Sequence, residues 1–218
     1  MYATSGKRLT RSERSKMNFS NIKHETIIGL LLGDGHISKR SVKGNSRFVY
    51  AQSAIRSQHI AYFNHVYSIF KPYCSKDFIP KLKIWVDKRT QNKYQSSSFT
   101  TLSLPCLNLF KNLFYVEGHK IVPANIAELL TYRGLAYLIM DDGSIQNKGL
   151  HLNTYGFSDK DIELLLSALK NKFQLKCSIH KHKAGLRIYI WEESMVSLRK
   201  NIVDYTHKDM LYKIGISS

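Results

Sequence analysis

The sequence predicts an α+β protein in which two pseudo-symmetric halves are fused into one chain. Three observations lead to this prediction: an apolar content high enough for folding, segments in which β-branched and aromatic residues alternate, and an order of helices and strands that occurs twice. Hydrophobic residues make up 43% of the 218 residues, a share typical of globular rather than disordered chains. A chain of this length can bury a real core, as one large domain or two small ones.

The charge of the chain is strongly positive. The 33 Lys and Arg residues outnumber the 16 Asp and Glu residues, so the formal net charge is +17. Such an excess attracts polyanions and favours nucleic acid as the partner. The less specific alternatives are that the chain is a ribosomal-type protein or binds a membrane surface. The longest apolar stretches, 27–32 and 135–140, are too short to span a bilayer, and no long amphipathic basic helix favours a membrane surface. We therefore expect no membrane partner.

Cysteine usage and residue composition bear on the compartment. Cys74, Cys106 and Cys177 are odd in number and widely spaced, which suits buried apolar side chains in a reducing, intracellular compartment. The many Lys, Ile, Asn and Tyr residues are typical of an AT-rich genome such as that of a mitochondrion or another organelle. The polar, basic segment 1–21 predicts a flexible arm, with an organellar leader or an expression remnant as alternatives.

The first half, placed at 22–130, opens with an apolar helical segment that ends in acid and glycine at 26–37. The period of two within 81–89 puts Lys81, Lys83 and Trp85 on one face and three apolar residues on the other, which suits a surface that reads a nucleic-acid groove. Three strands and three further helices are expected here, at 47–55, 81–89 and 96–104 and at 59–71, 104–114 and 123–130.

The same order recurs in the second half, placed at 131–218. A second apolar segment, 133–145, again ends in acid and glycine. A strand at 149–157 precedes a helix at 158–173, with Ser158 as N-cap and Asp161 at the capping-box position. A hairpin follows at 177–191, with its turn near Ala184-Gly185, and a helix at 194–205 closes the half. We interpret this recurrence as an internal duplication.

The two apolar segments carry acids at matching positions. Asp34 and Asp142 lie 142 − 34 = 108 residues apart, and Gly35 and Gly143 follow them as helix stops. Small residues at Gly29, Gly33 and Ala136 would let two helix backbones approach closely. We therefore expect these helices to pack together and to bring Asp34 and Asp142 side by side.

Carboxylates at two adjacent helix ends are electrostatically unfavourable. The partial negative charge of a helix C-terminus disfavours a carboxylate by about 0.3–1 kcal/mol, and two such ends repel each other further. A bridging divalent cation would relieve the repulsion, and oxygen ligands favour Mg²⁺ or Ca²⁺. The alternative is that Gly-Asp-Gly and Asp-Asp-Gly are ordinary turn sequences, but their recurrence at the same place in two halves argues against it.

The segments Ile28–Gly35 and Leu135–Gly143 resemble the paired motifs of the LAGLIDADG homing endonucleases, in the monomeric two-motif type encoded in introns. The resemblance covers about residues 22 to 215. It implies two αββαββα halves, each with a curved antiparallel sheet that forms part of a DNA-binding saddle, joined by the two packed motif helices. It also implies a monomer that cuts both strands of a long asymmetric DNA target across the minor groove and leaves 3′ overhangs.

The resemblance assigns roles to particular residues. It places metal binding on the carboxylates of Asp34 and Asp142 and on the carbonyls of Gly33 and Asp141, and a basic residue beside the metals in each half. The metal would be Mg²⁺, with Mn²⁺ able to substitute and Ca²⁺ supporting binding without cleavage. The segments Gly118–Pro123 and Met210–Lys213 match the basic positions and point to Lys120 and Lys213.

The sequence departs from the motif at four positions. Leu32 and Met140 replace its first acid, at a position that packs rather than reacts. Tyr137 stands where the first helix has glycine, so the two helices cannot pack with perfect symmetry. Asp141 replaces a small residue, which leaves its contact with metal open.

Base reading would fall to the two sheets, in the major groove on either side of the cut. Arg and Lys would pair with guanine and Asn and Gln with adenine, and many of these side chains would contact only phosphate. Alternation splits the run 180–183 between two faces, which favours a DNA-facing segment over a metal site. The candidates are Lys39, Arg40, Lys43, Arg47, Gln52, Arg56, Lys81, Lys83, Arg89 and Lys93 in the first half and Lys148, His151, Asn153, His180, Lys181, His182 and Arg187 in the second.

Two rival functions keep the same fold. An RNA-splicing maturase would bind its own intron RNA and need not cut DNA, and a DNA-binding regulator would lack catalysis altogether. The presence of Asp34, Asp142, Lys120 and Lys213 favours the nuclease over both.

Overall fold

The computed structural model describes residues 9–217, and these divide into two compact units. The first unit holds residues 9–20 and 35–111, and the second holds 21–34 and 112–217. The units differ from the predicted halves 22–130 and 131–218, which describe the sequence repeat, because the first motif helix belongs to the second unit. Within residues 9–217 no helix is long and apolar enough to cross a membrane.

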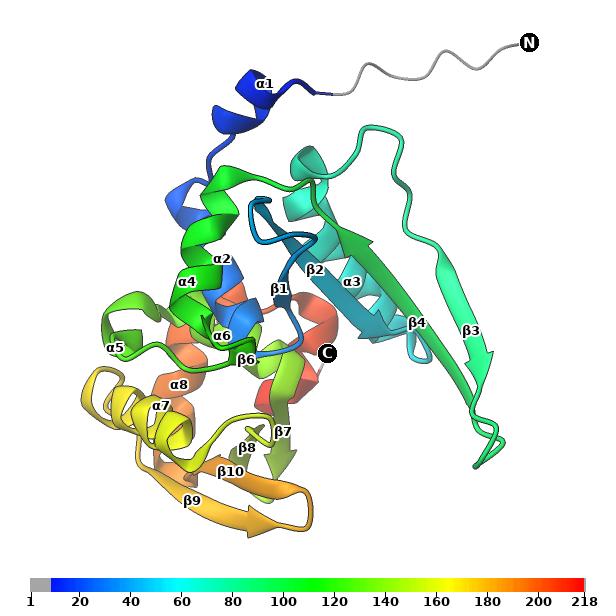
Figure 1. Cartoon of the computed structure of the whole chain (residues 1–218). Coiled ribbons are helices and arrows are strands. Elements are labelled where there is room, and N and C mark those ends of the chain that lie inside the picture. Colours follow the sequence, from blue (N-terminus) through cyan, green and yellow to red (C-terminus); the bar gives the residue numbers. More distant parts are fainter. Residues whose placement is uncertain (1–8, 218) are drawn as a thin grey trace. The chain divides into compact units, whose positions relative to one another are not determined.

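The first unit is built on a four-stranded antiparallel sheet in the order β1-β2-β4-β3 (Figure 1). Its strands are β1 (His36–Lys39), β2 (Ser46–Ser53), β3 (Leu82–Val86) and β4 (Lys93–Thr100). Its helices are α1 (Arg11–Ser15), α3 (Ser57–Phe70), η1 (Lys71–Tyr73) and η2 (Pro105–Leu107), and α4 (Asn108–Phe114) leads out of it.

Aromatic side chains form the core of the first unit. Phe48 and Tyr50 of β2, Phe63 and Phe70 of α3, and Phe99 of β4 are almost wholly buried. Their ring centroids lie 4.9–6.3 Å apart, a spacing at which aromatic pairs attract each other beyond the gain from buried area. The alternation of these residues with polar ones along β2 is what turns one face of the sheet towards α3.

The predicted basic arm, 1–21, falls partly outside the described residues. Arg11–Ser15 forms a short helix with Thr10 and Glu13 in a capping box. Phe19 is buried against Phe70 and Tyr73, with ring centroids 5.8 and 4.6 Å away. The chain is thus anchored at Phe19, and the flexibility of the residues before it stays a prediction.

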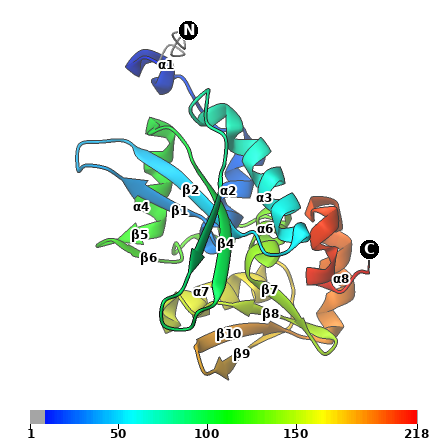
Figure 2. The ribbon, with the colours of Figure 1, turned by 90° about the vertical axis from the view of Figure 1, so that its right-hand side faces the viewer.

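The second unit repeats the topology of the first. Its sheet has the order β7-β8-β10-β9, with each pair antiparallel (Figure 2). Its strands are β5 (Tyr115–Val116), β6 (His119–Lys120), β7 (Gly143–Gln146), β8 (Gly149–Asn153), β9 (Cys177–His182) and β10 (Gly185–Ile190). Its helices are α2 (Asn21–Leu32), α5 (Ile126–Leu129), α6 (Tyr132–Asp142), α7 (Asp159–Asn171), α8 (Glu192–Ile202), η3 (Val203–Tyr205) and η4 (Lys208–Ile214).

The matching strand orders confirm the duplicated α+β fold with pseudo-symmetric halves. The family resemblance implies a strand after each motif helix, but the residue patterns did not locate β1 and β7. Each begins directly after a motif and has only four residues, too few for alternation to stand out. The predicted Ser158–Asp161 capping box is present, with the Asp161 N–H donating to Ser158 Oγ at 3.3 Å and the Ser158 N–H donating to Asp161 Oδ2 at 3.2 Å.

The motif helices α2 and α6 pack directly on each other in the second unit. A Cβ at Gly29 would lie 2.1 Å from the carbonyl oxygen of Gly134, so the helix backbones touch at this point. The predicted partner, Ala136, is buried, but the small residue that faces α2 is Gly134. The Cβ of Tyr137 lies 2.9 Å from the same Cβ position, which agrees with the predicted asymmetry of the two motifs.

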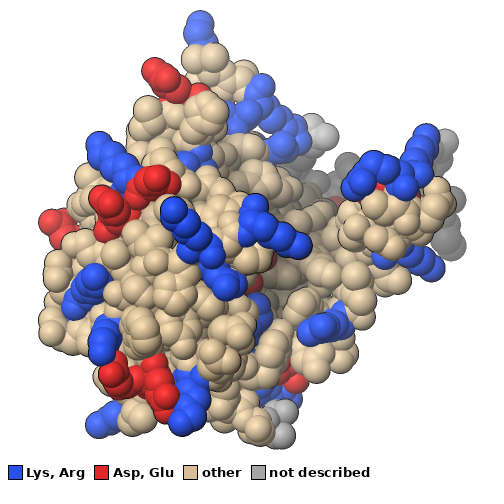
Figure 3. All heavy atoms as spheres, turned by 90° about the horizontal axis from the view of Figure 1, so that it is seen from below, with Lys and Arg blue, Asp and Glu red and all other residues tan. Residues whose placement is uncertain are grey.

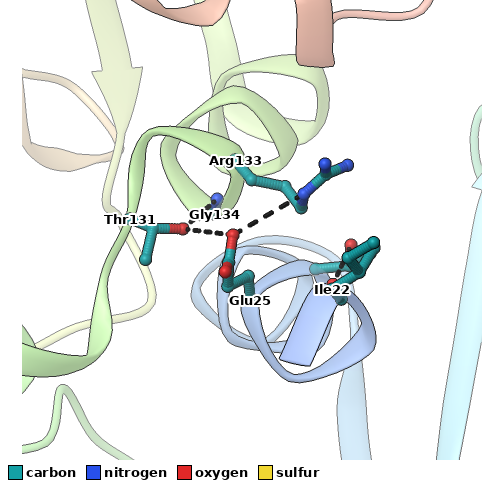
Figure 4. A network of polar contacts seen from close by, with 6 residues as sticks. Ile22, Glu25, Thr131, Arg133 and Gly134 are labelled. Carbon is teal, nitrogen blue, oxygen red and sulfur yellow. Dashed lines mark hydrogen bonds and ion pairs between the residues drawn. The ribbon is translucent and has the colours of Figure 1, made fainter. Parts of the chain in front are cut away.

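A polar network ties the N-terminal ends of the two helices together (Figure 4). The N-cap Thr131 accepts the N–H of Gly134 at 3.3 Å and donates its hydroxyl to Glu25 Oε2 at 3.0 Å. Arg133 Nε lies 3.6 Å from the same carboxylate oxygen. These contacts fix the N-terminal ends of α2 and α6 relative to each other, and so help to set where their C-terminal ends lie.

Candidate active site

The motif acids lie at the C-terminal ends of the packed helices. Asp142 is the last residue of α6, whereas Asp34 follows the end of α2 by two residues. Burial raises the pKa of Asp142 to about 7, with the charge of Asp34 as the next cause, while Lys120 and Lys213 pull the pKa down. The effect of Asp34 on this pKa agrees with two carboxyl groups close enough to repel each other, as predicted from their spacing.

The predicted helix stops work differently from expectation. Gly143 has extended backbone angles, φ −76° and ψ 147°, so it is not needed there for a left-handed conformation. A Cβ at Gly143 would instead lie 2.5 Å from the carbonyl oxygen of Ile139. Gly35 does not cap α2 at all, because that helix has already ended at Leu32.

Lys120 lies at the end of the first motif helix. It stands in the two-residue strand β6, and its Nζ donates to the carbonyl of Gly33 at 2.7 Å. Burial lowers its pKa, although the carboxylates of Asp141, Asp142 and Asp34 oppose that shift. A few residues on, the Val122 N–H donates to Asp161 Oδ1 at 2.9 Å, so the first turn of α7 helps to hold this segment in place.

Lys213 occupies the corresponding place at the end of the second motif helix. It is carried by η4, and its Nζ donates to the carbonyls of Gly143 at 2.8 Å and Asp141 at 3.3 Å. The four predicted catalytic residues thus converge at one place in the second unit, with one lysine on each helix end. Their roles stay a prediction.

Asp141 differs from the other acids in what its carboxylate contacts. Its Oδ2 accepts the backbone N–H of Asp34 at 3.0 Å. The same side chain lies against Gly33, where an added Cβ would be 2.5 Å from Oδ2. The carboxylate of Asp141 is therefore directed at the backbone of the first motif.

A cavity of 180 Å³ adjoins the Lys120 side of the site. It is walled by Leu32, Gly33, Lys120, Asp142 and the loop from Asn153 to Phe157 that joins β8 to α7. The Lys120 ammonium lies 5.8 Å from the ring centroid of Phe157. Sequence analysis extended the predicted strand 149–157 through this loop, whereas β8 ends at Asn153. Of the loop residues it selected only Asn153, because the place of the others beside the motif depends on the tertiary fold.

The donor set of the site consists of oxygen atoms. In the described part of the chain no three His, Cys, Asp or Glu side chains gather where they could hold a metal ion. The carboxylates of Asp34 and Asp142 and the carbonyls of Gly33 and Asp141 remain, and oxygen donors suit Mg²⁺, Mn²⁺ and Ca²⁺. Because burial of Asp142 and the charge of Asp34 both disfavour the ionised form of Asp142, the residues fit a bound divalent cation.

The second sheet has one apolar and one polar face. Leu150, Leu152, Ile188 and Ile190 are wholly buried on the side of α7 and α8. The strand pairing places five of the predicted DNA-binding residues together on the opposite face: His151, Asn153, His180, His182 and Arg187. Alternation puts Lys181 on the apolar side, and Lys148 lies in the β7–β8 turn, 3.2 Å from Glu192.

A chain of hydrogen bonds runs across this polar face. His151 Nε2 lies 3.3 Å from His180 Nδ1, His180 Nε2 lies 3.0 Å from Ser178 Oγ, and Trp191 Nε1 donates to Ser178 Oγ at 3.1 Å. Burial lowers the pKa of His151 to about 4, so it is neutral at neutral pH. Sequence analysis missed Ser178 and Trp191, although alternation with His180 and Arg187 places them on this face.

In the first sheet the register separates the predicted residues in the same way. Arg47 and Lys83 share the polar face with Ser38, Trp85 and Tyr94, and Arg47 Nε donates to Ser38 Oγ at 2.9 Å. Lys39, Gln52 and Lys93 alternate onto the face of the aromatic core, which does not favour base reading by them. Arg40, Lys43, Arg56, Lys81 and Arg89 lie outside the strands.

Basic side chains are also spread over the face seen in Figure 3, where acidic ones gather in a few small groups. This distribution agrees with the net charge of +17 and with a polyanionic partner.

Comparison with known proteins places the chain in a family. Residues 24–198 match the model of the LAGLIDADG DNA endonuclease family. DNA endonuclease I-ChuI of Chlamydomonas applanata is 29% identical over 214 residues, which cover 91% of this chain and 97% of that protein. The cytochrome b mRNA maturase bI2 of Saccharomyces cerevisiae is 32% identical over 198 residues, or 87% of this chain, but this chain spans only 46% of the maturase.

A solved structure shows the same architecture. The homing endonuclease I-WcaI, determined bound to its DNA recognition sequence, superimposes with a TM-score of 0.83 at 27% identity, covering 93% of this chain and 89% of that one. Together with the paired acidic helix ends and the repeated sheets, these matches establish that the chain belongs to the LAGLIDADG DNA endonuclease family.

Proposed function

We propose that this protein is a site-specific endonuclease that cuts both strands of a long, asymmetric double-stranded DNA target with the help of divalent metal. The observation that carries the proposal is the convergence of Asp34, Asp142, Lys120 and Lys213. They come from four separate segments and meet where the two motif helices end. The cut would be made across the minor groove and leave 3′ overhangs, as the family resemblance implies.

The residues of the site divide the chemistry between them. The carboxylates of Asp34 and Asp142 and the carbonyls of Gly33 and Asp141 would hold the metal, for which we propose Mg²⁺ with Mn²⁺ able to substitute. Bound metal would supply an activated water and neutralise charge on the phosphate. The ammonium groups of Lys120 and Lys213 would stabilise the negative charge that develops on the phosphate oxygens. In the metal-free chain Lys120 donates to the Gly33 carbonyl and Lys213 to the carbonyls of Asp141 and Gly143. Each ammonium would therefore leave the carbonyl that the metal takes and turn to the phosphate.

Target recognition would belong to the polar faces of the two sheets. Arg47 and Lys83 in the first sheet, and Asn153 and Arg187 in the second, lie on these faces and would reach base edges. His151 is only 3% exposed, so it would act through His180 rather than contact bases itself. The His151–His180–Ser178–Trp191 chain would keep the imidazoles in fixed orientations. We propose that the protein acts as a monomer, because one chain carries both motifs.

A second function is favoured by one observation. The yeast protein to which this chain is 32% identical is named as an mRNA maturase, so this chain could bind the RNA of its own intron. We propose an organellar, intron-encoded origin on the same ground. The maturase reading predicts tight binding of intron RNA and does not require Asp34 or Asp142.

The test is incubation of the full chain with randomised and intron-flanking DNA in Mg²⁺, followed by sequencing of the ends. The endonuclease predicts discrete double-strand cuts with 3′ overhangs at one long site. Parallel reactions in Ca²⁺ should show binding of the same site without cutting. Binding without cleavage in both metals would contradict the endonuclease, and intron RNA would then be the ligand to titrate.

A further inference from the structure

The two motifs end differently even though their residues correspond one to one. The offset of 108 residues pairs Gly33 with Asp141 and Asp34 with Asp142. Helix α6 continues through Asp142, whereas α2 ends at Leu32, two residues before Asp34. Asp142 is thus held by its own helical turn, and Asp34 needs another support for its backbone.

The corresponding residues Gly33 and Asp141 face each other across the helix pair. A Cβ at Gly33 would lie 2.6 Å from the Cβ and 2.5 Å from the Oδ2 of Asp141, and separations below 3 Å are not sustained by real side chains. The space between the helix ends therefore holds one side chain and not two. Asp141 fills it, and Gly33 leaves it open.

Asp141 uses this space to reach the first motif. Its Oδ2 accepts the N–H of Asp34 at 3.0 Å. Asp34 is exposed, so water can also reach this N–H. A carboxylate is a stronger acceptor than a neutral oxygen, and this one is fixed to the partner helix, so it can hold the Asp34 backbone in one place.

We infer that Asp141 is a positioning residue, whose side chain fixes the backbone of Asp34 and so aims the Asp34 carboxylate into the site. The glycine of the first motif then leaves room for the aspartate side chain of the second, and that side chain holds the backbone of the first. The two motifs are therefore not interchangeable. The part of this inference that concerns cleavage rests on the proposed function, whereas the part that concerns the backbone of Asp34 does not.

Three variants separate this role from a role of the carboxylate charge. Asp141→Asn keeps an oxygen acceptor and removes the charge, and Asp141→Ala removes both. Should the alanine variant not fold, Asp141→Gly, which copies the residue of the other motif, takes its place. Asp204→Ala, at an exposed acid in η3, is the matched control.

The first measurement is amide hydrogen exchange by NMR on the metal-free full chain. We expect exchange at Asp34 to rise about tenfold or more in Asp141→Ala and much less in Asp141→Asn. Exchange at Asp142, inside its own helix, should stay unchanged in both variants. Unchanged exchange at Asp34 in Asp141→Ala would overturn the inference whether or not the protein cuts DNA.

The second measurement is cleavage of the target in Mg²⁺ with binding in Ca²⁺. Asp141→Ala should lose about tenfold or more in cleavage rate with the DNA Kd unchanged, and Asp141→Asn, which keeps the acceptor, should lose clearly less than Asp141→Ala. Equal, severe loss in both variants would show that the carboxylate charge itself is needed and would overturn the positioning role. If the wild-type chain does not cut, the proposed function fails, and the exchange experiment still decides what Asp141 does.

Discussion

The two ends of the α2–α6 pair put their polar groups to opposite uses. At the N-terminal ends, Glu25 is matched by the Thr131 hydroxyl and the Arg133 guanidinium, and further along α2 the backbones touch at Gly29 and Gly134. At the C-terminal ends, Asp34 and Asp142 repel each other, and burial raises the pKa of Asp142 to about 7. The comparison shows one helix pair that is stabilised at one end and left electrostatically unfavourable at the other, as expected of a site that a ligand completes.

The largest expected effect falls on the lysines of the C-terminal ends. Lys120→Met and Lys213→Met should each slow DNA cleavage by about 10²–10³-fold, because each removes a cation that can stabilise charge on the phosphate. Single-turnover cleavage rates with saturating protein measure this. Lys208→Met, at an exposed lysine in the same helix as Lys213, is the control and should cut normally. A normal rate in either of the first two variants would remove that lysine from the site.

The next effect is on stability, and its sign is opposite to that of most substitutions. The pKa of Asp142 is raised from 3.8 to about 7, so the stability that this group contributes is full below pH 4 and is lost as the pH rises through 7. Asp142→Asn should therefore stabilise the metal-free protein at pH 8, by an amount on the order of 3 kcal/mol, and change little at pH 4.

Thermal unfolding in EDTA at the two pH values measures this difference. Added Mg²⁺ should raise the melting temperature of the wild type more than that of Asp142→Asn, because a bound cation relieves the repulsion. A variant less stable than wild type at pH 8 would contradict the account of this end of the helix pair.

A smaller effect is expected where the helix backbones touch. Gly29→Ala would place a Cβ 2.1 Å from a backbone oxygen, so the helices must move apart, at a cost of about 1–3 kcal/mol. Urea unfolding measures the loss. Gly156→Ala is the matched control for stability, since a Cβ there meets nothing within 4 Å, and it should stay within about 0.5 kcal/mol of wild type. Equal stabilities would mean that the close approach is not required.

The smallest effect should come from the network at the N-terminal ends. Thr131→Ala removes the N-cap of α6 and the hydroxyl bonded to Glu25, and should cost about 1 kcal/mol. Thr131→Ser keeps the oxygen and should recover most of the loss. At a temperature where both variants are folded, their cleavage rates should be normal. A cleavage defect without loss of stability would contradict the assignment of the N-terminal ends to stability alone.

Local patterns predicted much of this molecule because they depend on neighbouring residues. The Ser158–Asp161 capping box, the convergence of Asp34 and Asp142, and the repeat of the sheets all follow from spacing along the chain. The strands β1 and β7 were missed because four residues carry too little alternation. Which residue packs on Gly29, and why Asp141 is an aspartate, depend on contacts between segments about a hundred residues apart, and no local pattern contains them.

The base-reading residues show the same limit. Alternation correctly grouped Lys83 with Trp85, but composition alone also selected Lys39, Gln52 and Lys93, which the register turns towards the core face. Register is set by the pairing partner, so a basic residue in a strand can be assigned to a face only once its neighbours are known.

The most direct test of the central claim is cleavage by Asp34→Asn and Asp142→Asn of a DNA target that the wild type cuts in Mg²⁺. We predict that neither variant makes double-strand cuts, while both bind the same DNA in Ca²⁺ as tightly as the wild type. Robust double-strand cleavage by both variants would contradict the assignment of the two helix ends as the catalytic centre.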